Sequence, residues 1–142
     1  MKNRRVIIVL IISMLGFLYA EESPAYTAAS VETLAVTSQS WDGSPIGWYP
    51  YGCPQVTVLR ITVPSGVKLA LHKHPIPLVA YMISGELSVE TEAGKKAVFQ
   101  SGDPIIEVID TWHFGSSTGE EDAVLVAFYM GVTRLPNTIE KE

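Results

Sequence analysis

Three histidines are the residues of this chain best suited to chemistry. The sequence contains only His72, His74 and His113. His72 and His74 lie two positions apart among β-type residues, and side chains two apart on a strand point to the same face. Two imidazoles on one face, with a third from a later strand, can form one side of a metal's coordination sphere. Because neutral imidazole suits iron, zinc, copper and nickel, the spacing predicts a site for one such divalent ion.

The elements that must position these histidines are predicted to be β-strands. The strongest signal is 55–63 (QVTVLRITV), which is β-branched, alternating and followed by a Pro-Ser-Gly turn. Ser84-Gly85 is typical of a tight hairpin. No segment after residue 20 keeps a 3.6-residue apolar period over several turns. The other strand-like runs are 32–38, 67–71, 78–83, 86–91, 96–100, 105–109, 111–116 and 123–131. Many short strands separated by Gly and Pro turns predict an all-β sandwich or closed barrel.

The first twenty residues have the pattern of a secretory signal peptide. Three basic residues precede an apolar run over 6–18, and Ala20 precedes two acidic residues. We expect cleavage after Ala20 and a periplasmic or secreted protein. The alternative is an uncleaved membrane anchor, although the apolar run is shorter than the roughly 20 residues of a membrane span.

The remaining chain predicts one acidic domain. We interpret 21–40 as a tether and first strand, 41–134 as the barrel, and 135–142 as a charged tail. Loss of residues 1–20 would move the formal net charge from −5 to −8, which argues against nucleic-acid binding. Cys53 is the only cysteine, so it is either a reactive or intermolecular thiol or, as we favour, a buried small residue.

The surroundings of the first two histidines make the metal hypothesis more specific. Gly66 is followed by five residues and then by His72-Lys73-His74, with Gly85 eleven positions further on. This spacing resembles the first motif of the cupin superfamily, G-x5-H-x-H-x3-E-x6-G.

The third histidine extends the resemblance. Gly102 followed by His113 is similar to the second cupin motif, G-x5-P-x-G-x2-H-x3-N, and the two motifs together cover roughly residues 55–131. The resemblance implies an RmlC-like jelly-roll barrel of two antiparallel sheets, with the three histidines projecting into its mouth. It also implies a homodimer, because many cupins pair in this way.

The sequence departs from both motifs. Leu78 stands at the position of the first motif's Glu, while Val108, Asp110 and Ser117 replace the Pro, Gly and Asn of the second. Without the Glu, a three-His site would keep the full charge of a divalent ion, attract an anionic small molecule and leave coordination positions open. The alternative is a cupin that has lost its metal and keeps its histidines as hydrogen-bonding pocket residues.

Strand alternation suggests further pocket residues. If Leu78 points inward, Ala80 and Met82 do so too and form an apolar wall. Arg60, inside an apolar strand, either binds a carboxylate ligand or, more commonly for such a residue, reaches solvent or pairs with an acid. Glu107 either supplies the missing carboxylate, acts as a general base or, as we favour, faces solvent.

Two classes of function fit these features. The first is a metal-dependent enzyme, with dioxygenase chemistry as the specific hypothesis, because three-His cupins resembling thiol and diketone dioxygenases use ferrous iron. The second is a non-catalytic barrel that binds or senses a small molecule outside the cytoplasm, with a degenerate metal site.

Overall fold

The computed structural model describes residues 29–142. This range contains nine β-strands, and none of its residues belongs to a helix. Within it, therefore, no helix is long and apolar enough to cross a membrane. The predicted signal peptide over 1–20 lies outside the described residues.

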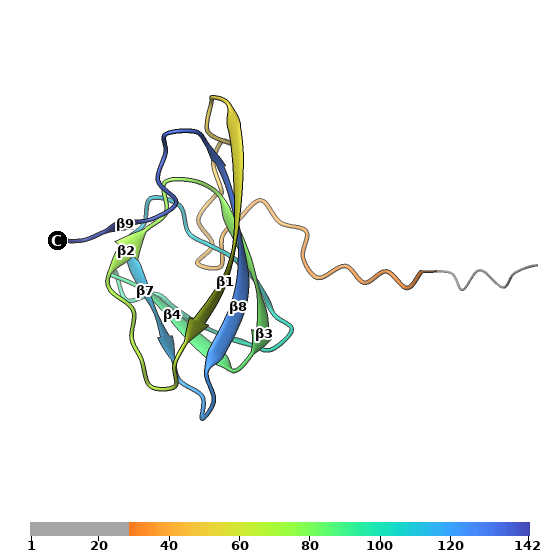
Figure 1. The fold of residues 1–142 in the computed structure, drawn as a ribbon, viewed down its shortest axis with the longest axis vertical. Helices are drawn as coiled ribbons and strands as arrows, with labels where there is room; N and C mark the ends of the chain where they lie inside the picture. Colours follow the sequence, from red (N-terminus) through yellow and green to blue (C-terminus); the bar gives the residue numbers. More distant parts are fainter. Residues whose placement is uncertain (1–28) are drawn as a thin grey trace, which may run out of the picture. The chain divides into compact units, whose positions relative to one another are not determined.

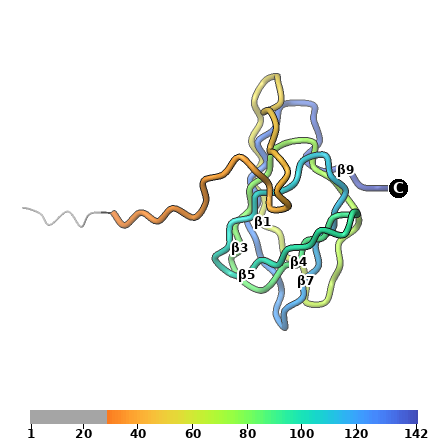
Figure 2. Tube along the Cα trace, turned by 180° about the vertical axis from the view of Figure 1, so that it is seen from behind, coloured from red at the N-terminus to blue at the C-terminus, as the bar shows by residue number. Residues whose placement is uncertain are grey.

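The strands form two antiparallel sheets that face each other (Figures 1 and 2). The four-stranded sheet runs in the order β1 (Pro54–Val63), β8 (Ala123–Val132), β3 (Leu78–Ser84) and β6 (Pro104–Ile106). The five-stranded sheet runs in the order β5 (Lys96–Gln100), β4 (Glu86–Thr91), β7 (His113–Ser117), β2 (His72–Lys73) and β9 (Ile139–Glu140). The prediction of an all-β fold with two antiparallel sheets is confirmed.

The core lies between the two sheets, where alternation along each strand places apolar side chains. In β8, every second residue from Ala123 to Tyr129 is buried, and the residues between them are less buried. β3 repeats the pattern from Leu78 to Met82. The inner faces therefore share one apolar cluster, and the same parity decides which side chains can reach the space between the sheets.

Two predictions about local structure are wrong. Residues 32–38 form no strand, and only the adjacent Gln39 makes an isolated bridge, to Pro45. Residues 67–71 contain one isolated bridge, from Lys68 to Ser116. The predicted tail over 135–142 contains the two-residue strand β9, which pairs with β2. β-type composition shows that a segment suits a sheet, but pairing needs a neighbouring backbone edge that composition does not reveal.

Gly85 is a corner between the two sheets. β3 and β4, on either side of it, belong to different sheets, so the predicted hairpin at Ser84-Gly85 is wrong. Gly85 has a φ of 73°, and a Cβ there would lie 2.4 Å from the carbonyl oxygen of Asp122. Both the positive φ and this close approach require glycine, and the corner brings β4 onto the sheet that carries His72 and His113.

Cys53 is exposed at the start of β1, so the interpretation of this residue as a buried one is wrong. It immediately precedes Pro54, and its carbonyl oxygen accepts a hydrogen bond from the amide of Thr133 at 3.0 Å. This contact ties the start of β1 to the end of β8 through the backbone and does not involve the thiol.

Candidate metal centre

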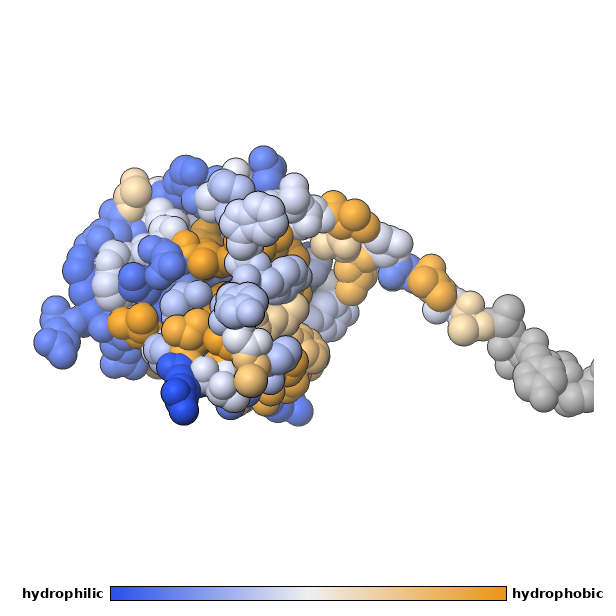
Figure 3. Space-filling view, turned by 90° about the horizontal axis from the view of Figure 1, so that it is seen from above, coloured by the Kyte–Doolittle hydropathy of each residue, from blue (hydrophilic) through white to orange (hydrophobic). Residues whose placement is uncertain are grey.

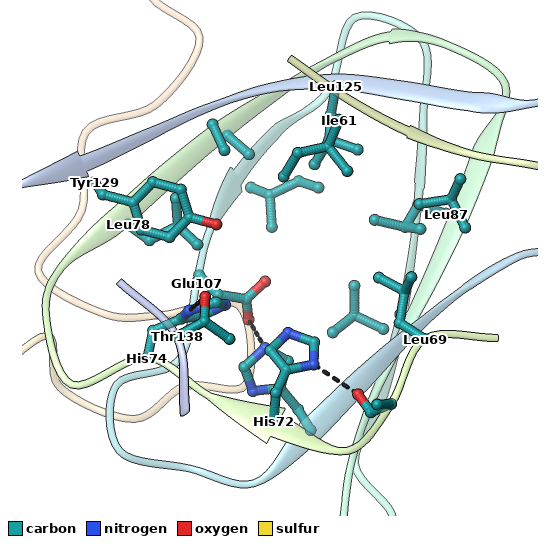
Figure 4. A pocket seen from close by; sticks show the side chains of 18 of the residues that line it. Ile61, Leu69, His72, His74, Leu78, Leu87, Glu107, Leu125, Tyr129 and Thr138 are labelled. Carbon is teal, nitrogen blue, oxygen red and sulfur yellow. Dashed lines mark hydrogen bonds and ion pairs between the residues drawn. The ribbon is translucent and has the colours of Figure 1, made fainter. Parts of the chain in front are cut away.

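The five-stranded sheet brings the three histidines together. His72 on β2 pairs directly with His113 on β7, and His74 follows β2 and makes a parallel bridge with Ile109. The ring centroids lie 4.6 to 5.1 Å apart. Figure 4 shows His72 and His74 at one end of a cavity between the sheets. The structure thus places all three predicted ligands in one cluster.

Each histidine is held in the same way by its Nδ1 atom, which lies within hydrogen-bonding distance of a backbone carbonyl oxygen. The pairs are His72 with Ala70 (2.7 Å), His74 with Asn137 (2.9 Å) and His113 with Thr111 (2.8 Å). A carbonyl oxygen only accepts, so we assign the proton of each neutral ring to Nδ1. The lone pair of each Nε2 is then free for a metal.

These atoms fit a transition-metal ion. One nitrogen from each ring lies within 4.8 Å of the others. Imidazole nitrogen binds zinc at about 2.0–2.1 Å, so three such donors around one ion lie about 3 to 3.5 Å apart, within reach of small ring rotations. Carbonyl oxygens on the opposite nitrogens are the usual outer partners of metal-binding histidines, since they fix ring orientation.

His72 and His74 are neutral near pH 7, as metal ligands must be. Burial lowers the pKa of His74 to about 4, and the hydrogen bond to Asn137 only partly opposes this effect. Burial also lowers the pKa of His72. Both rings therefore present lone pairs, not positive charges, to the space between them.

Glu107 lies beside this cluster, and the expectation that it faces solvent is wrong. It is 8% exposed, and its Oε1 accepts hydrogen bonds from Trp41 Nε1 at 2.7 Å and from the Val108 amide at 2.9 Å. The same oxygen lies 3.7 Å from His113 Nε2. β6 ends at Ile106, and the loop that follows turns inward, so Glu107 and Val108 are both buried.

Glu107 also places a carboxylate near Leu78, the residue that stands where the cupin motif has Glu. Its amide donates to the carbonyl oxygen of Leu78 at 3.0 Å, so the two residues are neighbours across the sheet. Leu78 fills the place of the motif's Glu, and the carboxylate comes from the adjacent chain segment. The expectation of an unopposed divalent charge did not include this carboxylate, which lies 3.7 Å from His113 Nε2.

The cavity beside the histidines has a volume of about 250 Å³ and two unlike ends (Figure 4). The polar end contains the histidines, Glu107, Tyr129, Thr138 and Glu140, and none of the lysines and arginines among residues 29–142 lines the cavity. The rest is aliphatic, and Figure 4 labels Ile61, Leu69, Leu78, Leu87 and Leu125 there. The cavity therefore suits a small molecule with an apolar body and one polar group.

The remaining predicted residues are divided between the cavity, the core and the surface. Leu78 and Ala80 line the cavity, whereas Met82 is fully buried in the core and is not among the lining residues. Arg60 is exposed on β1, away from the cavity lining. Inward parity alone did not distinguish Met82, which is a core residue, from Leu78 and Ala80, which line the cavity.

Sequence reasoning missed Tyr129 and Thr138. Tyr129 continues the inward alternation of β8, and its ring lies 5.6 Å from that of His74. Burial raises the pKa of Tyr129, so the hydroxyl stays protonated as a hydrogen-bond donor. An inward tyrosine at the end of an apolar strand was a usable signal, but Thr138 carried none because its segment has no strand pattern.

Asp110 shows why one motif departure is tolerated. It stands at a motif glycine and has a φ of 49°, a left-handed conformation that aspartate adopts more readily than most residues. Its amide donates to the carbonyl oxygen of His74 at 2.8 Å, and its carboxylate pairs with Lys73 at 3.1 Å. The loop before His113 is thereby fastened to the segment that carries the other two histidines.

Comparisons with known proteins support the fold. No family model matches the sequence, and no curated protein matches it. Among solved structures, a double-stranded β-helix protein from Klebsiella pneumoniae subsp. pneumoniae has a TM-score of 0.53 and 20% identity, covering 68% of this chain and 91% of its own. A cupin-like protein from Thermotoga maritima has a TM-score of 0.54 and 14% identity, covering 61% of this chain and 64% of its own.

Larger enzymes contain the same fold. Oxalate decarboxylase from Lactobacillus farciminis, solved as a formate complex, has a TM-score of 0.52 and 20% identity, covering 60% of this chain. This chain spans only 26% of that enzyme, so the likeness concerns one part of it. Two antiparallel sheets, the clustered histidines and these neighbours together identify the chain as a protein of the cupin, or double-stranded β-helix, fold.

Proposed function

We propose that the protein binds one divalent transition metal through Nε2 of His72, His74 and His113, and uses it to hold and transform a small molecule. The observation that carries this proposal is the hydrogen bond of every Nδ1 to a carbonyl oxygen. Histidines that were merely solvated on an exposed strand would not each need a carbonyl oxygen to fix the orientation of the ring. A bound ion would supply a Lewis-acidic position for an oxygen, nitrogen or sulfur atom of the ligand.

The residues around the metal position would orient that ligand. Glu107 has one oxygen engaged with Trp41 and Val108, and no hydrogen bond joins its other oxygen to a described residue. That oxygen can accept a hydrogen bond from a group held at the metal. Tyr129, with its pKa raised by burial, can donate one. The aliphatic walls would exclude water from the rest of the ligand.

The ligand class that fits is uncharged. Among the described residues, Glu107 and Glu140 supply the carboxylates in the cavity lining, and these offset the charge of a divalent ion. The expectation of an anionic ligand assumed that no carboxylate lies near the metal ion, whereas Glu107 and Glu140 both line this cavity. We therefore propose a neutral molecule with an apolar body and one metal-binding group, such as a phenol, an enol or a thiol.

Two probes of similar size test this ligand class. With the cobalt-loaded protein, 4-ethylphenol is expected to change the visible spectrum at concentrations at least 10-fold lower than 4-methylbenzoate, because the carboxylate is repelled by Glu107. The Glu107→Gln variant keeps the side-chain shape but removes the negative charge. It should therefore bring the effective concentrations of the two probes closer together. Tighter binding of the benzoate to the unmodified protein would show that the metal charge dominates and would refute the neutral class.

For the reaction we propose metal-dependent oxidation of the dioxygenase type, since the histidines occupy one side of the ion and leave positions for both substrate and dioxygen. A binding or sensing barrel is the second candidate, supported by the largely aliphatic cavity. Dioxygen uptake by the iron-loaded protein with a panel of phenols, enols and thiols separates the two. Ligand binding without uptake under any metal supports the binding barrel.

We also propose a homodimer built on the outer face of the four-stranded sheet. This face carries exposed Val56, Val58, Ile83 and Phe128, and apolar side chains gather on that side of the molecule in Figure 3. β1 and β8, with ten residues each, make this face about 33 Å long, and four strands about 4.8 Å apart make it at most roughly 19 Å wide, an area of about 600 Å² against the ~800 Å² that each partner buries in a stable complex. A second copy of the chain offers a matching face.

The expected result in sedimentation equilibrium is a mass of two chains. Val58→Lys places a charge in the middle of β1, within the proposed interface, and should give a monomer with unchanged circular dichroism. The matched control is Lys96→Ala on β5, in the other sheet, which should leave the dimer intact. A monomeric unmodified protein would exclude this interface.

Finally, we propose that the protein is exported, on the basis of the basic and apolar pattern over residues 1–20. Intact-mass analysis of the protein from the periplasmic or secreted fraction should give a chain beginning at Glu21. A chain that retains residues 1–20 in the membrane fraction would instead support the anchor alternative.

A further inference from the structure

The last residues of the chain reach the metal centre. The carbonyl oxygen of Asn137 lies 2.9 Å from His74 Nδ1, and Thr138 Oγ1 lies 3.2 Å from the same nitrogen. Thr138 and Glu140 line the cavity. We call residues 137–141 the C-terminal strap, because this segment crosses the edge of the site.

His74 differs from the other two histidines in how its ring is held. His72 and His113 hydrogen-bond to carbonyl oxygens only two residues earlier in the chain, so their own strands fix their orientation. The partner of His74 is 63 residues away. One of the three proposed ligands is thus oriented by a segment that is remote in sequence.

The strap is held at the edge of the five-stranded sheet by a small number of contacts (Figure 1). Glu140 pairs with His72 and Ile139 with Lys73, which makes β9 the edge neighbour of β2. The Lys141 amide donates to the carbonyl oxygen of Leu71 at 2.9 Å, and its ammonium group pairs with Glu92. Thr138, Ile139 and Glu140 are exposed on their outer side. A two-residue edge strand undocks more easily than the core strands.

We propose that the C-terminal strap is a positioning element of the metal centre, so that strap docking and metal binding reinforce each other. This inference rests on the proposed function, since it concerns the same three ligands. Docking fixes the Nδ1–H of His74 on Asn137 and aims Nε2 at the ion, and a bound ion in turn holds the ring against the strap. By thermodynamic reciprocity, the factor by which docking strengthens metal binding equals the factor by which metal strengthens docking.

The first test is the affinity of the protein for Zn²⁺, measured by competition with a chromophoric chelator. A chain ending at Pro136 is expected to bind Zn²⁺ about 10 to 100-fold more weakly, the usual cost of removing an outer partner of a ligand. Thr138→Val keeps the chain length and removes the hydroxyl near His74, so we expect a smaller loss. Thr133→Val is the matched control outside the cavity lining and should leave the affinity unchanged.

The second test is hydrogen exchange at the Lys141 amide in the full chain. Saturation with Zn²⁺ should slow this exchange by about the same factor as the loss of affinity on truncation. Exchange that is equally fast with and without Zn²⁺, together with equal affinities of full and shortened chains, would overturn the proposal. If the shortened chain does not fold, Thr138→Val and the exchange measurement decide the question alone.

The outcomes separate this inference from the proposed function. A full chain that binds Zn²⁺ with an affinity independent of the strap keeps the metal centre and rejects the positioning role. A full chain that binds no transition metal rejects both. A weaker Thr138→Val variant with an unaffected Thr133→Val variant supports the strap as part of the centre.

Discussion

Replacing His113 with alanine is expected to weaken Zn²⁺ binding by roughly 10² to 10³-fold. His113 is almost completely buried and supplies one of three proposed donors. Structural zinc sites with four ligands release about 10–16 kcal/mol on binding, or about 2.5–4 kcal/mol for each ligand. The loss should be read from chelator competition at a fixed pH, because protons compete for the same nitrogens.

The comparison variant for His113 lies on the same strand. Burial alternates along β7, so Ser116 points to the opposite face from His113. Ser116→Ala should therefore bind Zn²⁺ as tightly as the unmodified protein. Circular dichroism should show that both variants keep the β-fold. An unchanged dissociation constant for folded His113→Ala would show that this residue is not a ligand.

The metal-free protein is expected to lose roughly 3 kcal/mol of unfolding free energy as the pH falls from 6.5 to 4. His74 has a pKa of about 4 in the folded protein against 6.5 for an unperturbed group, so only the unfolded chain takes up its proton in this window. A fall in pH stabilises whichever state binds more protons, and here that is the unfolded state. The contribution of His74 to the unfolding free energy is therefore fully present above pH 6.5 and is lost below about pH 4. Burial of His72 acts in the same direction.

Urea unfolding in the presence of a chelator, at half-unit steps of pH, measures this effect. Carboxylates also titrate near pH 4, so the informative quantity is the difference between the unmodified protein and His74→Gln. The variant lacks the titrating ring and should show a flatter dependence on pH between 6.5 and 4. Equal slopes for the two proteins would mean that His74 titrates normally in the folded state.

Much of the fold and the metal cluster could be predicted from the sequence because the signals are local. The β-branched, alternating run over 55–63 and the almost wholly apolar run over 123–131 both suit strands, and the structure has β1 and β8 there. Strand parity and the motif spacing were enough to predict that His72, His74 and His113 meet, and the structure brings them together. That prediction did not require the course of the loops.

The parts that were missed depend on contacts between distant segments. The inward turn of Glu107 follows from where β6 ends and from the hydrogen bond to Trp41, 66 residues away. The C-terminal strap docks on β2 through backbone pairing. Backbone pairing does not require an alternating apolar pattern, so the sequence carried no signal for it. Residues 32–38 have strand composition, but no described strand pairs with them.

The measurement that tests the central claim most directly is the metal content of the protein as isolated. The full precursor should be expressed, and the protein purified without chelators and examined by elemental analysis beside His113→Ala. We predict close to one iron, zinc, copper or nickel per chain in the unmodified protein and almost none in the variant. A metal-free protein that cannot be reloaded with any of these ions would contradict the proposed centre.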